Sequence, residues 1–128
     1  MRCCSGHSHG YERSHFLNGY FQSAEQAFDP AVHIVPHGKG TAASPYRKPF
    51  GLTPSAGMVA IVAGAAGEFA PSSNNFKHVA NVPHGNNDLH ALQTMGSFLL
   101  DIDGDVLTGR FIDLHGSVLD EFYVVKAE

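Results

Sequence analysis

Two histidines one residue apart, His7 and His9, have the types and spacing that could bind metal ions in this chain of 128 residues. They belong to the run GHSH, which follows a short stretch near the start of the sequence. In an extended segment, side chains at positions i and i+2 point to the same side. Neutral imidazole is a common metal ligand near neutral pH. The spacing predicts that both rings offer a nitrogen to adjacent metal ions where a strand passes into a loop. The alternative is a pair of surface histidines in a loop.

The residues around this pair resemble a known motif. The run SGHSHGYERS, residues 5–14, closely resembles the last metal-binding motif of calcineurin-like metallophosphoesterases. It is most similar to the purple acid phosphatase-like branch, in which GHxH is followed by an aromatic residue, a Glu and an Arg. Further segments resemble the family in its own order and extend the similarity over nearly the whole chain: residues 46–49 (YRKP), 57–64 (GMVAIVAG), 96–104, 111–113 and the stretch through 124–126.

This resemblance implies a fold and a reaction. The fold is α/β, and the chain is expected to be the C-terminal part of a four-layer α/β/β/α metallophosphoesterase sandwich, itself mostly β-strand and loop. The implied reaction is hydrolysis of phosphate monoesters by an acid phosphatase-like hydrolase with a dinuclear metal centre. His7 and His9 would each bind a different ion, with Fe paired with Zn, Mn or a second Fe. Two cations about 3.5–4 Å apart clamp a phosphate ester and lower the pKa of a bound water.

The family's other ligand blocks precede GHxH and do not occur in these residues: an early Asp, a GDxx block, a GNH[DE] block and a lone His. Residues 85–88 (GNND) resemble the third block, but Asn87 stands where the family has His. We therefore expect residues 1–128 to be the C-terminal portion of a domain whose N-terminal part is missing. Two histidines without carboxylates cannot hold two such ions, so this portion is expected to be inactive alone. A sheet cut in this way leaves an unpaired edge that favours self-association.

Two other functions remain open. One is a nucleotidase or phosphodiesterase on the same scaffold, which would also act on a phosphate ester. The other is a non-catalytic β-rich interaction module that retains only the remnant of a phosphatase site.

Composition excludes several classes of partner. The formal charge is −4, from 8 Lys and Arg against 12 Asp and Glu, and no basic run is present. Nucleic-acid binding is therefore not expected. No apolar run approaches 18 residues, so we expect no membrane span, and no signal peptide is visible. The compartment stays unassigned. Cys3 and Cys4 are adjacent and would form only a strained disulfide, so they are read as small apolar residues rather than as extra metal ligands.

Other residues near the motif have two interpretations each. Tyr11, Glu12 and Arg13 either orient the histidine loop or form a local structural pair that holds it. His15 lies either at a pocket rim or on the open surface. The remaining histidines show no ligand spacing and are expected in loops or turns: His33, His37, His78, His84, His90 and His115.

The elements that must position these residues are mainly strands and loops. Residues 1–5 read as a strand end, residues 6–19 as the loop that carries the histidines, and residues 58–63 as a buried strand. We also expect a helical turn within 22–30 with Ser23 as its N-cap. The other expected segments are a strand at 32–35 and loops or irregular connections at 36–54, 65–75 and 76–94.

The last third predicts an antiparallel meander. Its strands are expected at 96–102, 106–113 and 118–126, joined by turns at 103–105 and 114–117. The alternation at Leu100/Ile102 and Phe122/Val124 predicts one buried face. Residues 101–105 (DIDGD) resemble the start of an EF-hand loop, but the sixth position is Val106 and the twelfth is Ile112, so a hairpin turn is expected.

Overall fold

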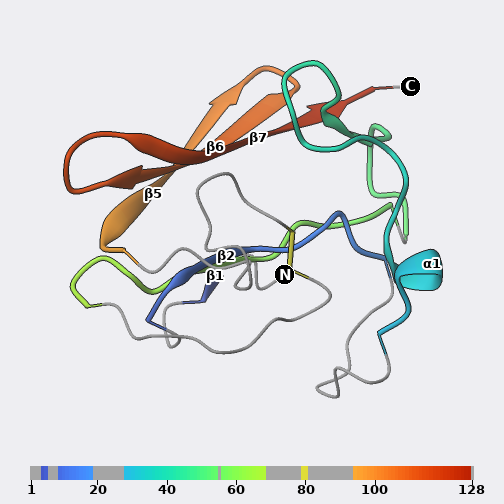
Figure 1. Ribbon diagram of the computed structural model, residues 1–128. Helices are drawn as coiled ribbons and strands as arrows, with labels where there is room; N and C mark the ends of the chain where they lie inside the picture. Colours follow the sequence, from blue (N-terminus) through green and yellow to red (C-terminus); the bar gives the residue numbers. More distant parts are fainter. Residues whose placement is uncertain are drawn as a thin grey trace.

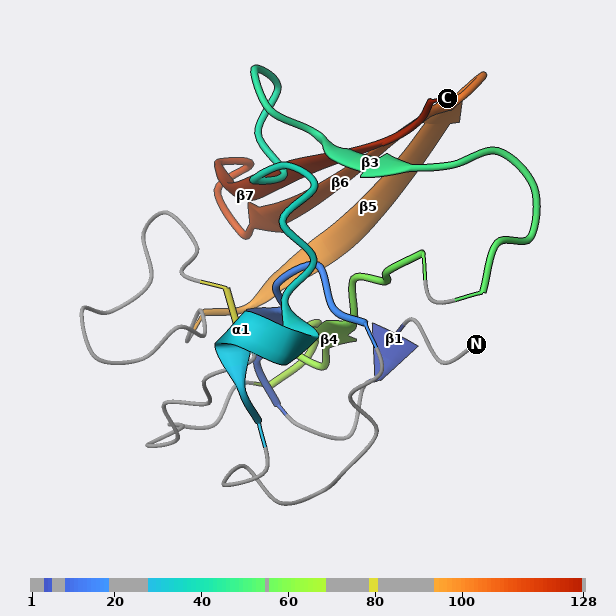
Figure 2. The ribbon, with the colours of Figure 1, turned by 90° about the vertical axis from the view of Figure 1, so that its right-hand side faces the viewer.

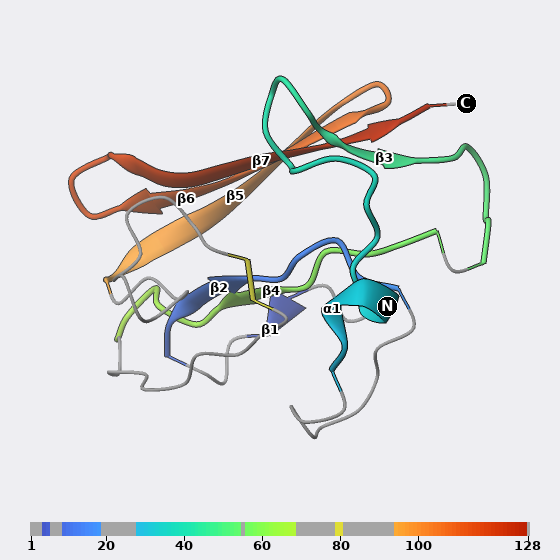
Figure 3. The same cartoon turned by 45° about the vertical axis from the view of Figure 1, so that its right-hand side comes forward.

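Strands form most of the regular structure in the part of the chain that the computed structural model describes, residues 4–5, 9–18, 28–54, 56–68, 79–80 and 94–127. They make a three-stranded sheet with the order β1-β4-β2 and a four-stranded sheet with the order β3-β7-β6-β5. The two sheets lie over one another as two layers (Figures 1 and 3). The expectation of a mostly β-strand and loop chain is confirmed. No helix among these residues has the length and apolar character needed to cross a membrane.

In the chain, the histidine motif lies between β1 and β2, two strands of the three-stranded sheet. Strand β1 (Cys4–Ser5) runs parallel to β4 (Ile61–Ala63), and β2 (Tyr11–Arg13) runs antiparallel to β4 on its other side. The buried strand expected at 58–63 is therefore present in its last three residues. Residues 11–13, expected as loop, are a strand instead, because Tyr11 and Arg13 both bury their side chains on one face of it.

The meander is confirmed. Strands β5 (Gly96–Asp103), β6 (Val106–Asp113) and β7 (Val118–Lys126) pair antiparallel in sequence order. The hairpin turn expected at 103–105 joins β5 to β6, with Gly104 at a φ of 56°. A positive φ is costly for other residues, which explains glycine at this turn.

The predicted buried face is correct for β7 but wrong for β5. Phe122 is buried and Val124 packs against the core. Leu100 is 45% exposed and Ile102 is 69% exposed. The reason is position, since β5 is the outer strand of its sheet and the second layer does not cover its far end.

Two further expectations fail. Tyr46–Lys48, placed in a loop by the surrounding Gly and Pro, forms β3 and pairs parallel with β7 (Figure 2). The buried Tyr46 ring explains why this stretch is ordered against the sheet. Residues 32–35 do not form the expected strand, because the first two belong to the single turn α1 (Pro30–His33) and Ile34 makes only an isolated antiparallel bridge with Leu17. Asp29 caps this turn, accepting a 2.9 Å hydrogen bond from the Ala31 N–H, and proline is favoured at the first helical position. The turn expected with Ser23 as its cap lies outside the described residues, except for its last positions.

The core lies between the two sheets and is rich in aromatic rings. Tyr11 stacks on Phe111 with ring centroids 4.4 Å apart, and Phe16 stacks on Tyr46 at 5.1 Å. Tyr11 of β2 and Phe111 of β6 belong to different sheets. Phe16, which follows β2, stacks on Tyr46 of the four-stranded sheet, so ring stacking contributes to the contact between the two layers.

Candidate functional site

His9, the described residue of the GHSH run, lies at one end of the three-stranded sheet, between β1 and β2 in the chain. Because β1 and β4 are parallel, their carboxyl ends meet at this edge, and β2 begins there. The Gly64 N–H, just after β4, donates a 3.0 Å hydrogen bond to the Gly10 carbonyl, just before β2. His9 directly precedes Gly10, and its side chain is 44% exposed.

The described donors at this edge are one imidazole and one carboxylate. His9 Nδ1 lies 3.4 Å from Glu68 Oε2, and these side chains are 44% and 72% exposed. Nitrogen and oxygen donors of this kind suit Zn, Fe or Mn, but two donors are fewer than a tetrahedral site needs. Within the described ranges, no group of three or more His, Cys, Asp or Glu side chains is arranged to bind a metal ion.

His7, the other predicted ligand, lies outside the described residues, so the distance between the two rings stays a prediction. The other histidines that the structure describes are separate from this edge. His37 lies in a loop and His115 in the turn between β6 and β7, as expected, whereas His33 ends α1 rather than lying in a loop. The predictions for the others concern residues that the structure does not describe: His78, His84 and His90.

The most elaborate polar arrangement in the described part is a buried cluster just beyond the histidine segment. Arg13 makes two bonds to Asp120, from Nε to Oδ2 at 2.7 Å and from Nη2 to Oδ1 at 3.0 Å. The Tyr11 hydroxyl also donates to Asp120 Oδ2 at 2.7 Å, and Arg13 Nη1 donates to the Tyr46 hydroxyl at 3.0 Å. The Arg13 guanidinium lies 5.3 Å from the centroid of the Phe122 ring. We call Tyr11, Arg13, Tyr46 and Asp120 the buried polar cluster.

Burial dominates the electrostatics of this cluster. Asp120 is 1% exposed and Arg13 is 6% exposed. Burial opposes the charge on Arg13, but the hydrogen bond and charge of Asp120 outweigh it and raise the pKa of the guanidinium. Burial, together with the Asp120 charge, raises the pKa of the Tyr11 hydroxyl far above its ordinary value. The cluster is therefore a fixed ion pair with neutral tyrosines, not a proton donor near neutral pH.

The cluster decides between the two interpretations of residues 11–13. Tyr11 and Arg13 are structural, but their partner is not local, since Asp120 lies 107 residues beyond Arg13. They join β2 of one layer to β7 of the other. Sequence reasoning missed Asp120, although the alternation of β7 places it on the same face as Phe122 and Val124. An acidic residue in register with buried positions needs a cationic partner.

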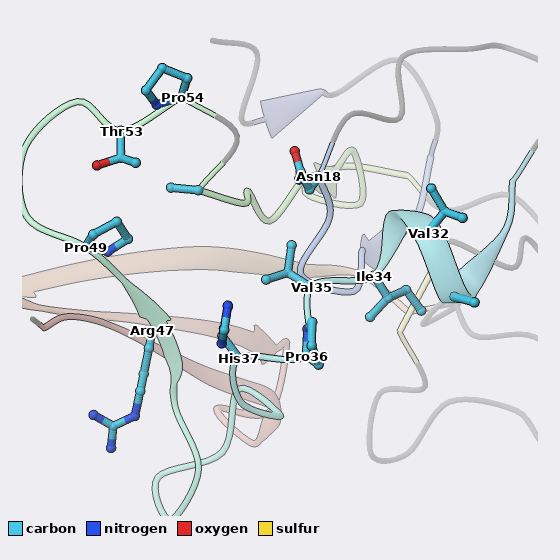
Figure 4. Close-up of a pocket in the computed structure, with 12 residues that line it drawn as sticks. Asn18, Val32, Ile34, Val35, Pro36, His37, Arg47, Pro49, Thr53 and Pro54 are labelled. Carbon is cyan, nitrogen blue, oxygen red and sulfur yellow. The ribbon is translucent and has the colours of Figure 1, made fainter.

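A cavity of about 440 Å³ lies beside α1 and the loop that follows β3 (Figure 4). Its lining is mostly aliphatic and proline residues, with Asn18, His37, Arg47 and Thr53 as polar members. The Arg47 side chain points away from Asn18 and Thr53 (Figure 4). The polar residues in the described part of this lining therefore do not converge on one point, unlike those of a typical catalytic pocket. His15 lies instead at a second cavity of about 240 Å³, together with Arg13 and Lys39.

Comparison with known proteins yields no match: no family model, no curated protein and no solved structure is similar to this chain.

Proposed function

We propose that this chain forms the C-terminal portion of a dinuclear-metal phosphoesterase that hydrolyses phosphate monoesters. The wider domain would be a four-layer α/β/β/α sandwich, of which the two β layers described above would be the inner part. His7 and His9 would bind its two ions, with remaining ligands supplied by a missing N-terminal part.

The observation that carries this proposal is the position of His9. It directly precedes Gly10, whose carbonyl accepts a hydrogen bond from Gly64 just after β4, and so lies near the end at which the parallel strands β1 and β4 finish. In open α/β sheets, ligands bind outside the carboxyl ends of the strands. A ligand pair on the connection from β1 to β2 would therefore face the side of the sheet where such sites are built.

The buried polar cluster supports the same function by fixing the histidine segment. Arg13 lies four residues after His9, and its two bonds to Asp120 hold β2 against the other layer. A ligand loop whose two ends are tied to strands loses less conformational freedom when it binds. When bound, the two ions would supply an activated water and neutralise phosphate charge. The role of this chain would be to hold the imidazoles of His7 and His9 in place.

The deciding experiment uses the coding sequence upstream of Met1. We expect in-frame GDxx and GNH[DE] blocks, and we expect the longer product, loaded with Fe and Zn, to hydrolyse p-nitrophenyl phosphate. Changing His7 or His9 to Ala should lower turnover at least a hundredfold, since each removes a ligand of one ion. His115→Ala, in a distant turn, is the matched control and should leave turnover unchanged.

Residues 1–128 alone should be inactive in the same assay, and turnover that His7→Ala abolishes would contradict that expectation. A longer product with both blocks that cleaves only nucleotides or phosphodiesters would favour the alternative enzyme classes. A start codon at Met1 with no upstream coding sequence would rule out the phosphoesterase portion.

An interaction module is the second candidate, because of the outer strand β5. Leu99, Leu100 and Ile102 are all more than two-fifths exposed on this strand, and β5 pairs with β6 on one side in its sheet. Exposed edge strands of this kind are templates for pairing with another chain. The absence of upstream ligand blocks would favour this candidate.

A further inference from the structure

An apolar cavity of about 190 Å³ lies between the two sheets, apart from the histidine segment. Its walls come from both layers and from the segment leading into β4. The residues that line it include Met58 and Val59 from that segment, Ile61 of β4, and Leu100, Leu107 and Val124 from the four-stranded sheet.

Among the described residues of this lining, Lys48 is the single charged one. It lies two residues after the buried Tyr46 on β3, so both side chains are on the face that looks toward the other layer. Its Nζ donates one hydrogen bond of 2.8 Å, to the Gly57 carbonyl. Within the described residues, no carboxylate lies at ion-pair distance from it. An ammonium group has three N–H donors, so two remain for an anionic partner.

The cavity is large enough for a small apolar group and has access to the surface. An apolar cavity of about 150 Å³ can hold benzene, so 190 Å³ suits a ring or an alkyl chain of medium length. Leu100, in the wall, is 45% exposed and therefore lies at its mouth. An apolar interior with one cation selects a ligand with an alkyl body and one anionic end.

We propose that this cavity binds a medium-chain alkyl carboxylate. The alkyl chain lies between the two sheets, and the carboxylate accepts hydrogen bonds from Lys48 Nζ. This site is independent of the phosphoesterase proposal, because neither His7 nor His9 takes part in it.

Calorimetric titration of the 128-residue chain with carboxylates of four, six, eight and ten carbons tests the site. Each added methylene should raise the affinity about fourfold until the cavity is full, and then no further. Absence of saturable binding would overturn the proposal, as would an affinity that does not depend on chain length.

Two variants separate the alkyl and carboxylate contributions. Lys48→Met keeps an apolar side chain of similar length but removes the charge, and should lower octanoate affinity about fivefold while leaving 1-octanol affinity unchanged. Val59→Phe fills the cavity and should abolish binding of both ligands, with the urea midpoint showing that the variant is folded. Lys39→Met removes an exposed lysine outside the cavity and is the matched control.

An equal octanoate affinity in the Lys48→Met and Lys39→Met variants would overturn the role of Lys48. Full octanoate binding by folded Val59→Phe would place the ligand outside the cavity and overturn the site. If Val59→Phe does not fold, the Lys48→Met comparison and the chain-length series still decide.

Discussion

The two sheets of this molecule are built in opposite ways. The strands of the β5-β6-β7 meander have eight or nine residues, follow one another in sequence and are joined by tight turns. The strands of the histidine-bearing sheet have two or three residues, and β4 comes from some fifty residues beyond β2. Local pairing forms readily, whereas short strands far apart in sequence must be held by other contacts.

The buried polar cluster provides such a contact. It attaches β2 to β7 through Arg13 and Asp120, and the Tyr11 ring stacks against Phe111 of β6. The regular sheet therefore serves as the support on which the irregular, histidine-bearing sheet is positioned. Four variants test this contrast between the two sheets.

The largest expected effect comes from Asp120→Ala. It leaves the guanidinium of Arg13 buried without its anionic partner, which typically costs about 3–5 kcal/mol of unfolding free energy. Urea unfolding followed by circular dichroism measures the loss. Asp101→Ala on exposed β5 is the control and should change the free energy by less than about 0.5 kcal/mol.

The double variant Arg13→Met/Asp120→Leu sharpens the same comparison. Apolar replacement of both partners is often neutral, so it should be more stable than Asp120→Ala alone. If Asp120→Ala were as stable as the wild type, the buried polar cluster would not hold the two sheets together.

Gly109→Ala tests the packing of the regular sheet itself. A Cβ at this position would lie 2.3 Å from a ring carbon of Phe122, so the ring must move. We expect a loss of about 1–3 kcal/mol in unfolding free energy, measured by thermal or urea unfolding. Gly67→Ala, where no atom lies within 4 Å of the added Cβ, is the matched control. Equal stability of the two variants would contradict close packing at Gly109.

The smallest effect concerns alkaline pH. Tyr11 has a pKa raised in the folded state, so its contribution is complete below the ordinary tyrosine pKa of about 10 and is lost above it. Between pH 10 and 11 this tyrosine should cost about 1 kcal/mol of unfolding free energy. Tyr11→Phe should flatten the slope of stability against pH. Equal slopes for wild type and Tyr11→Phe would disprove the burial of a neutral hydroxyl.

The same contrast explains how much of the fold could be predicted from sequence. The meander was predictable because alternation and turn residues such as Gly104 act within a few positions. Strand β3 was missed because Tyr46 lies among loop-forming residues and pairs with a strand near residue 124. Helix α1 was mistaken for a strand because the branched residues that follow Pro30 outweighed the capping signal of Asp29.

The candidate site stays a prediction, and its structural support could not be read from the sequence. The GHSH spacing points to His7 and His9, and of these two the structure describes His9, next to the Gly10 carbonyl that is bonded to Gly64 just after β4. The carboxylate that anchors the following strand is Asp120, and only the three-dimensional pairing of Arg13 with β7 reveals it. The sequence also did not predict the contact of Glu68 with His9, because this contact depends on the path that the chain takes after β4.

The distance in sequence between Arg13 and Asp120 has a consequence for biosynthesis. A ribosome adds about 5–20 residues per second, so the carboxylate is made several seconds or more after the guanidinium that it must neutralise. Throughout that interval the nascent β2 segment keeps its cation hydrated and cannot settle into the interior. Final attachment of the histidine-bearing segment therefore waits until translation has passed Asp120.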